Sequence, residues 1–162
     1  HNVELVIARP FSHTGPGQTP GFVVPAFAHQ IAQIESGRLD VLEHGDLQSS
    51  RDFSDVRDVV KAYRLLIEKA PAGQTFNICS GRSVAVQTLL DRLISFSTTP
   101  IPTRPDPARM RGEKTPPFHG NCDLLRDTLG WAPNTPLETT LRDVLEDQRR
   151  QVALLPAPAV AR

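Results

Sequence analysis

The sequence has little of what several large classes of protein need. Its 162 residues include two cysteines, one tyrosine, one tryptophan and one methionine. No apolar run approaches the roughly 18 residues that a membrane-spanning helix requires. Lys and Arg number 18, and so do Asp and Glu, which gives a formal net charge of +0. Bulk charge therefore gives no reason to expect nucleic acid or a membrane surface as a partner.

The cysteines and histidines do not form a metal-binding pattern. Cys79 and Cys122 are far apart in the sequence, and the five histidines show neither H-x-x-x-H nor cysteine-paired spacing. We therefore predict no metal site and interpret both thiols as buried or idle in a reducing compartment. The N-terminus lacks the basic and apolar regions of a signal peptide. Together these features lead us to expect a cytoplasmic protein.

What the sequence does contain is an alternation of strand-like and helix-like segments, which predicts an α/β fold. Strands are expected at residues 3–8, 41–44 and 75–80 and around Arg51, the first of them buried in a parallel sheet. Apolar residues at helical spacing predict helices over residues 23–36, 55–70, 86–96, 123–129 and 137–151. The length suggests one domain, residues 1–152, followed by a disordered tail at 153–162.

Local signals predict where several of these segments begin and end. Residues 11–21 hold three glycines and two prolines and are expected to form a loop. Within it, Gly15 and Gly17 are expected at backbone positions that need special dihedrals. Residues 99–107 hold four prolines and are expected to be extended or irregular. T-P-L-E at 135–138 matches a capping box with proline at the first helical position.

Arg51 is expected on extended chain just before a helix, where a loop can present its side chain. Ser54 or Asp55 can cap that helix, and Asp55 and Asp58 are interpreted as capping or solvated residues of one helical turn. A guanidinium matches phosphate oxygens, so one interpretation of Arg51 is a contact to a nucleotide diphosphate. The other interpretation is a salt bridge to Asp52 or Asp55, and the spacing alone does not separate the two.

Two further segments place cations or free N–H groups outside regular structure. R-M-R-G-E-K at 109–114 is flanked by prolines and is interpreted either as a ligand-binding loop or as a solvated basic loop. G-F-V-V at 21–24 opens a helix, whose free N–H groups can bind anions or polar bases. Plain packing of Phe22 and Val23 explains the same pattern equally well.

These residues resemble motifs of one family. R-D-F-S-D-V-R-D at 51–58 is similar to the R-D-(F/Y/W)-x-x-V-x-D segment of extended short-chain dehydrogenases acting on nucleotide sugars. R-P-F-S-H-T-G-P-G-Q at 9–18 resembles the R-P-F-N-H-T-G-P-G-Q of the GDP-mannose branch. Within that branch the resemblance is closer to the GDP-4-keto-6-deoxymannose reductases than to the GDP-mannose 4,6-dehydratases. L-G-W-A-P at 129–133 also matches and is interpreted as an aromatic anchor after a helix stop.

The resemblance implies a role for each candidate site residue. The implied substrate-binding residues are Ser12, Phe22, Val23, Arg51, Arg111 and Lys114. Arg51 and Arg111 would bind the diphosphate or ribose, and Ser12, which replaces the family's Asn, would touch the sugar or ribose. Lys114 stands where the family usually has an acid. His13 would border the nicotinamide end of the cofactor, although a histidine satisfied by local loop carbonyls is the alternative.

The resemblance also implies the architecture and the ligands. It covers residues from about 3 to about 149 and only the second half of such an enzyme. The chain would be the C-terminal part of a Rossmann-like extended short-chain dehydrogenase, with the small substrate-binding lobe and without the N-terminal dinucleotide-binding half. The substrate would be a GDP-sugar and the cofactor NADP, bound mainly by that other half. A homodimer would belong to the full-length enzyme.

Catalysis in this family uses a Tyr-x-x-x-Lys pair with a Ser or Thr helper. The single tyrosine, Tyr63, has no lysine four residues later, and no Gly-rich dinucleotide fingerprint is present. The chain begins at His1, and we interpret it as a truncated frame or fragment that is inactive alone. The open alternatives are a GDP-mannose 4,6-dehydratase, another sugar-nucleotide epimerase or dehydratase, and a non-catalytic remnant that binds a nucleotide sugar.

Overall fold

A computed structural model describes residues 3–110 and 116–156 of the chain. Its strands are β1 (Ile7–Pro10), β2 (Ser12–Thr14), β3 (Leu42–His44), β4 (Ser50–Asp55), β5 (Thr75–Ile78), β6 (Ser83–Ala85) and β7 (Thr103–Pro105). Its helices are α1 (Val23–Glu35), α2 (Val56–Lys69), α3 (Val86–Ile94), α4 (Asp123–Leu129) and α5 (Leu137–Ala153), with a 3-10 turn η1 (Pro107–Arg109). Within these described residues, no helix is both long and apolar enough to cross a membrane.

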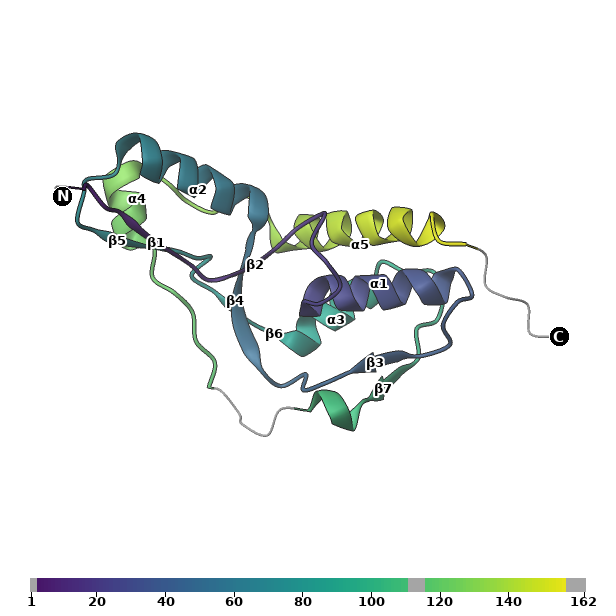
Figure 1. Cartoon of the computed structure of the whole chain (residues 1–162). Helices are drawn as coiled ribbons and strands as arrows, with labels where there is room; N and C mark the ends of the chain where they lie inside the picture. Colours follow the sequence, from purple (N-terminus) through teal and green to yellow (C-terminus); the bar gives the residue numbers. More distant parts are fainter. Residues whose placement is uncertain (1–2, 111–115, 157–162) are drawn as a thin grey trace.

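The strands form small sheets in which parallel pairing prevails. β1 pairs with β5, β2 with β4 and β3 with β7, all in parallel, whereas β6 runs antiparallel along the other edge of β4. Figure 1 shows β1, β5, α2 and α4 at one end of an elongated molecule and α1, α3, α5, β3 and β7 at the other, with β4 between them. The predicted α/β class is confirmed.

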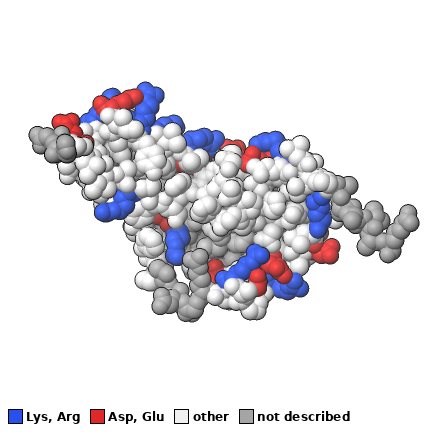
Figure 2. Space-filling view, viewed as in Figure 1, with Lys and Arg blue, Asp and Glu red and all other residues white. Residues whose placement is uncertain are grey.

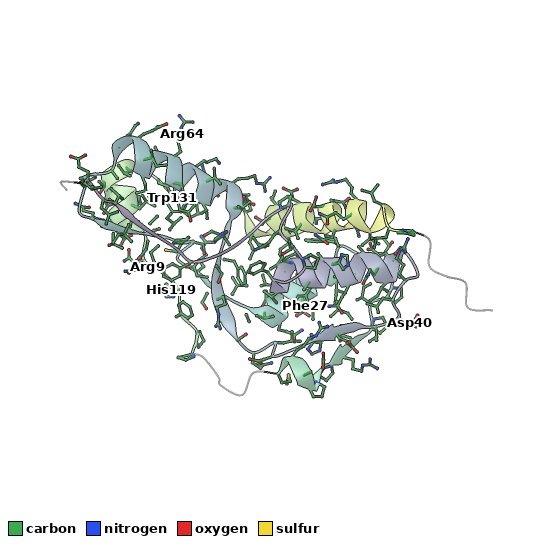
Figure 3. All side chains as sticks on the ribbon, in the orientation of Figure 1. Arg9, Phe27, Asp40, Arg64, His119 and Trp131 are labelled. Carbon is green, nitrogen blue, oxygen red and sulfur yellow. The ribbon has the colours of Figure 1, made fainter. Side chains whose placement is uncertain are left out.

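One hydrophobic core lies between α2, β5 and α4. Phe76 and Ile78 of β5 are buried together with Val59 of α2 and with Trp131, which follows α4. Figure 3 shows Trp131 beneath α2. Its indole Nε1 donates a hydrogen bond to the backbone oxygen of Asp58 at 3.0 Å. The geometry agrees with the interpretation of Trp131 as an aromatic anchor.

A second, larger core lies between α1, α3 and α5. Phe27 and Ile31 of α1, four residues apart and so on one helical face, are buried in one cluster with Leu141 and Leu145 of α5. Figure 3 shows Phe27 on the inner side of α1. Phe53 of β4 belongs to the same cluster. β4 therefore contributes to this core while leading directly into the helix of the other one.

Asp55 connects the two cores where β4 becomes α2. Its carboxylate caps α2 by accepting from the Arg57 N–H at 2.7 Å, which confirms one of the two predicted caps, and it accepts from Thr140 Oγ1 of α5 at 2.7 Å. The Arg57 guanidinium bridges Asp55 and Asp143 of α5, at 2.7 and 2.8 Å. Burial alone would raise the pKa of Asp55, but the hydrogen bonds from Arg57 and Thr140 hold that pKa below its ordinary value.

The prediction of a buried strand over residues 3–8 is wrong. The strand runs from Ile7 to Pro10, and the side chains of Val3, Leu5 and Ile7 are 76%, 62% and 48% exposed. β1 pairs with β5 on one edge, and no strand of the described residues covers its other edge. The residues are apolar as in an interior strand, but nothing within the described part of the chain buries them.

Three short strands lie where loops were expected or where no element was expected. β2 falls in the predicted loop at 11–21, β7 falls in the proline-rich stretch at 99–107, and β6 was not anticipated at all. Each has three residues, which is too short for an alternating pattern to identify. Their strand conformation comes from a partner that is distant in sequence, β4 for β2 and β6, and β3 for β7.

The predicted capping box of α5 is wrong. The N-cap position is held by Pro136, and no side chain caps the helix. The N–H groups of Asn134 and Thr135 instead donate to Asp58 Oδ2 of α2, at 2.9 and 2.7 Å. Asp58 was interpreted as capping or solvated, yet it is 1% exposed and supplies the acceptor from a distant helix. Sequence neighbours could not reveal this partner, which lies more than 70 residues away.

The C-terminal end of α5 is held by α1's flanking residue Arg38, whose guanidinium donates to the backbone oxygen of Leu155 at 3.0 Å. The last residues of the predicted tail, 157–162, lie outside the described part of the chain. The predicted disorder of that tail stays a prediction.

Several ion-paired carboxylates make the fold sensitive to acid. Burial would raise the pKa of Asp58, but hydrogen bonds from Thr135, Asn134 and Lys61 lower it. A hydrogen bond from Arg149 is the main cause that lowers the pKa of Glu35. A folded-state pKa below the unfolded value means that the unfolded chain binds protons more readily. The stabilisation is therefore fully present above the unfolded pKa of about 4 and is lost as the pH falls through the folded value.

We expect Asp58→Ala to lower the free energy of unfolding at pH 7 by about 1–3 kcal/mol, because the N–H groups of Asn134 and Thr135 lose the buried carboxylate that accepts from them. Urea denaturation measures this change. The loss should become smaller as the pH falls through the lowered folded-state pKa of Asp58, because the carboxylate of the native chain is then protonated as well. Asp127→Ala, which removes an exposed carboxylate paired with Arg126, is the matched control and should have little effect. Equal stability of Asp58→Ala and the native chain at pH 7 would contradict the assigned role.

Candidate functional site

An open groove of about 1340 Å³ lies where β2, β3 and β4 meet the first turn of α1. Its walls come from the segment that follows β1, from the N-terminus of α1, from the end of β3 and its following turn, from β4, and from η1. It exceeds the roughly 300–1,000 Å³ of a typical small-molecule site. The groove therefore has room for a ligand larger than a typical small molecule.

The structure brings five of the seven predicted site residues together on this groove. Ser12 and His13 line it from β2, Phe22 and Val23 from the start of α1, and Arg51 from β4. These residues are up to 39 positions apart in sequence, so the fold alone assembles them. Arg111 and Lys114 lie outside the described residues. Their binding roles stay predictions, as do those of the five.

Arg51 presents a guanidinium to the groove without a carboxylate partner among the described residues. It donates to the backbone oxygen of Ser50 at 2.8 Å, and its guanidinium carbon lies 5.6 Å from the centre of the Phe118 ring, a cation–π arrangement. Asp52 and Asp55 both bond elsewhere. The alternative interpretation, a salt bridge from Arg51 to one of these two, is wrong.

Asp52 lies directly beside Arg51 in β4 but serves a different set of partners. It is 1% exposed. Its Oδ1 accepts from the Ser80 N–H at 2.8 Å and from Ser80 Oγ at 2.6 Å. Its Oδ2 accepts from the N–H groups of Gly81 and Gly120, both at 3.0 Å. The carboxylate thus ties β4 to the turn between β5 and β6 and to the chain just before α4.

His13 is held in place by its own loop. Its Nδ1 donates to the backbone oxygen of Phe11 at 3.0 Å, as the alternative interpretation of a locally satisfied histidine anticipated. Gln18 binds the backbone oxygen of His13 at 3.4 Å and accepts from Thr14 Oγ1 at 2.8 Å. The Nδ1 bond leaves Nε2 as the ring atom available to a ligand. Both interpretations of His13 are therefore compatible with the structure.

The N-terminus of α1 supplies a positive end to the groove. Phe22 occupies the N-cap position without a side-chain cap, and the first turn carries no acidic residue. Phe22 is 60% exposed, whereas Val23 packs against the larger core. Uncapped N–H groups and the helix dipole favour an anionic or polar ligand group at such an end. The structure therefore shows packing for Val23, and the ligand-binding roles of both residues stay predictions.

Two residues of β3, Glu43 and His44, were missed as site residues, whereas Arg109 of η1 belongs to the segment 109–114 that was predicted to be either a ligand-binding loop or a solvated basic loop. Glu43 and His44 line the groove from the end of β3, and Arg109 lines it from η1. Arg109 pairs with Asp106 at 2.9 Å, and Glu43 is bound by Gln30 of α1 through its backbone N–H at 2.8 Å. The available signal was that β3 is a parallel strand, since ligands bind at the carboxyl ends of such strands.

Two glycines beside the groove, Gly15 and Gly120, lie where the structure leaves no room for a side chain. Gly17 has φ +83°, as a special dihedral was expected, but Gly15 has no positive φ. Gly15 is required because a Cβ there would collide with Val56. Gly120 is equally confined, since a Cβ would lie 2.5 Å from Cys79 Sγ and 2.8 Å from Phe11 Cζ. The prediction that Gly15 needs a special dihedral is therefore wrong, and the close approach of Val56 is the reason for glycine at this position.

Charge is balanced over the surface around the groove. Figure 2 shows Lys and Arg interspersed with Asp and Glu on the face in view, without a large field of one sign.

Within the described residues, no group of three or more His, Cys, Asp and Glu side chains can hold a metal ion. Burial is the main cause that raises the pKa of the Cys79 thiol to about 12, with Cys122 and Asp52 nearby. Cys79 is therefore protonated at neutral pH.

The parallel strands and the alternating helices define a Rossmann-like α/β chain, and its groove follows β1. A match to the family described as GDP-mannose 4,6 dehydratase covers residues 1–144. The chain belongs to this family, within the epimerase and dehydratase group of short-chain dehydrogenases, which confirms the resemblance of its motifs.

Individual relatives agree with this assignment. The chain is 38% identical over 149 residues to GDP-6-deoxy-D-mannose reductase of Pseudomonas aeruginosa, covering 91% of the chain and 49% of the reductase. It is 28% identical over 143 residues to GDP-6-deoxy-D-talose 4-dehydrogenase of Aggregatibacter actinomycetemcomitans, covering 88% and 46%. The solved structure of RMD from Pseudomonas aeruginosa complexed with NADPH superposes with a TM-score of 0.85 at 35% identity, covering 91% and 49%. The chain thus spans about half the length of these relatives.

We expect Gly120→Ala to lower the free energy of unfolding by about 1–3 kcal/mol, because its methyl group would force Cys79 and Phe11 apart beneath the groove. Chemical denaturation measures the change. Gly21→Ala is the matched control, since a Cβ there meets only Thr19 Oγ1 at 3.9 Å and the residue has no positive φ. Similar losses for the two variants would show that the space around Gly120 is not as confined as the structure indicates.

Proposed function

We propose that this chain binds the nucleotide-sugar substrate of an NADP-dependent oxidoreductase similar to the GDP-4-keto-6-deoxymannose reductases. The observation that carries the proposal is the Arg51 guanidinium, which lines the large groove and pairs with no carboxylate of the described residues. The 38% identity to a GDP-6-deoxy-D-mannose reductase supports the choice of reductase. The family match to GDP-mannose 4,6 dehydratase favours that dehydration as the second candidate reaction.

Arg51 is proposed to bind the diphosphate. Its cation is oriented by Ser50 and Phe118, so little side-chain freedom remains to be lost on binding. Charge-assisted hydrogen bonds from a guanidinium to phosphate oxygens contribute roughly 1.5–3 kcal/mol each. Arg111 is proposed to bind the diphosphate or ribose, and Lys114 the ribose.

The remaining site residues are proposed to bind the two ends of the substrate. Ser12 would hydrogen-bond the sugar or ribose. Phe22 and Val23 would line the nucleotide, with the uncapped N–H groups of α1 close to polar atoms of the base. The sequence similarity to enzymes of GDP-sugars supports guanine as that base.

The chain's own residues do not fit a complete dinucleotide site. β1 leads into Phe11 and β2, not into a Gly-rich turn and helix, and the sequence contains no G-x-G-x-x-G. His13 is the one residue proposed to border the cofactor. NADP is proposed for the longer protein on the similarity to RMD complexed with NADPH. No hydride step is assigned to the residues of this chain.

A non-catalytic nucleotide-sugar-binding role is the candidate of a different class. Tyr63 lies on α2, which does not line the groove, and Ile67 stands four residues later where a Tyr-x-x-x-Lys pair would need lysine. These observations favour binding without turnover for the chain as given. The two candidates share the binding site and differ only in whether residues beyond this chain complete the chemistry.

We expect the chain to bind GDP more tightly than UDP. We also expect Arg51→Ala to weaken GDP binding about 10- to 100-fold, in line with the loss of one or two charge-assisted hydrogen bonds. Isothermal titration calorimetry measures both affinities. Arg64→Ala is the matched control, because Arg64 lies on the outer side of α2 away from the groove and pairs with Glu68 (Figure 3).

No GDP binding by the native chain at millimolar concentration would overturn the proposed function. Equal affinities of Arg51→Ala and Arg64→Ala would overturn the role of Arg51. The same Arg51→Ala change in a full-length protein containing this sequence separates the two candidates. An oxidoreductase would show a raised KM for the GDP-sugar or a reduced turnover, whereas a binding protein would show no turnover in either form.

A further inference from the structure

We propose that Asp52 is a positioning residue of the groove, whose buried carboxylate fixes Arg51 and Phe118 relative to each other. The inference rests on the proposed function, because it states how the diphosphate-binding arginine is oriented. Asp52 itself does not line the groove, and Arg51 does. Neighbouring residues of a strand point to opposite faces, so Asp52 acts from behind the surface that Arg51 presents.

Asp52 is a buried carboxylate whose two oxygens are both hydrogen-bonded and which has no cationic partner among the described residues. Four donors surround it, three backbone N–H groups and the Ser80 hydroxyl, at 2.6–3.0 Å. A carboxylate buried to 1% exposure is costly unless every oxygen is hydrogen-bonded. The arrangement is therefore rigid, since moving any of the three segments away exposes the charge to an apolar environment or leaves an N–H group unpaired.

One of the four donors, the Gly120 N–H, belongs to the segment that carries Phe118, the aromatic partner of Arg51. Gly120 N–H binds Asp52 Oδ2, and Phe118 lies two residues before it. The Phe118 ring lies 5.6 Å from the Arg51 guanidinium carbon and 6.1 Å from the ring of Phe11, which lines the groove. Asp52 thus fixes both the strand that carries Arg51 and the segment that carries its aromatic partner.

Only a carboxylate can accept hydrogen bonds from all four donors at this position. Both oxygens face donors, so an asparagine must direct its NH₂ group at one side or the other. One orientation opposes the Ser80 N–H, and the other opposes the N–H groups of Gly81 and Gly120. Asp52→Asn therefore breaks the arrangement without changing the size of the side chain.

The test compares GDP affinity by isothermal titration calorimetry for the native chain, Asp52→Asn, Arg51→Ala and the double variant. We expect Asp52→Asn to weaken GDP binding about tenfold, or about 1.4 kcal/mol. The double variant should bind no more weakly than Arg51→Ala alone, because a displaced Arg51 has little left to contribute. Additive losses, or native affinity in Asp52→Asn, would overturn the proposal.

A matched control separates positioning from stability. Asp58 is also a buried carboxylate that accepts two backbone N–H groups, but it lies away from the groove. Asp58→Ala should lose stability and keep native GDP affinity at a temperature where it is folded. Equal weakening by Asp58→Ala and Asp52→Asn would show that the effect is general destabilisation and would overturn the positioning role.

Hydrogen exchange gives a readout that does not depend on GDP. In Asp52→Asn, amide exchange should accelerate at Ser80, Gly81 and Gly120, whose N–H groups donate to Asp52, while α5 stays protected. Ser80→Ala removes a single donor and should accelerate the same amides to a smaller extent, so the proposal stays testable if Asp52→Asn does not fold. Unchanged exchange in the folded variants would overturn it. If exchange accelerates in the variant but the native chain does not bind GDP, the positioning role of Asp52 is supported and only the proposed function is refuted.

Discussion

The structure depends on three buried or nearly buried carboxylates at every third position of one segment, Asp52, Asp55 and Asp58. Each is at most 3% exposed, and each receives donors from parts of the chain that are distant in sequence. Asp52 binds the β5–β6 turn and the residue before α4, Asp55 binds α5, and Asp58 binds the loop that leads into α5. Since an unpaired buried charge is costly, all of these segments must be in place together.

This segment also explains how the groove is formed. β4 pairs with β2 on one edge and with β6 on the other, so it fixes Ser12 and His13 on one side while its own Arg51 faces the groove. The carboxylates take up the backbone donors of neighbouring segments and leave the Arg51 cation without a carboxylate among the described residues. A site for an anionic ligand therefore follows from how the acidic residues of the same strand are used.

Much of the fold could be predicted from the sequence because it depends on local periodicity and local motifs. The five helices, β3, β5 and the cap at Asp55 all follow from residues within one or two turns of each other. The family was identifiable for a related reason, since its motifs at residues 9–18 and 51–58 are short and continuous. Five of the candidate groove residues lie in or close to those motifs, and the structure places them on one surface.

The errors have a common physical cause. Thr135 was expected to cap α5, yet its own N–H donates to Asp58 on another helix and no side chain caps α5. Gly15 was assigned a special dihedral, although contact with Val56 is what excludes a side chain there. Glu43 was not recognised at the groove because its position depends on the packing of β3 against β7. In each case the deciding partner is distant in sequence.

The sequence by itself determined the helices, the family and the residue types that can bind a diphosphate, because these are written in local spacing and short motifs. The tertiary structure alone decided which acidic residues are buried and which cation faces the groove. Arg51, Asp52 and Asp55 look equivalent as exposed charges or as a salt bridge when only their spacing is considered. They differ because burial makes each carboxylate take the nearest donors that folding brings to it, and those donors are Ser80, Gly81, Gly120 and Thr140 rather than Arg51.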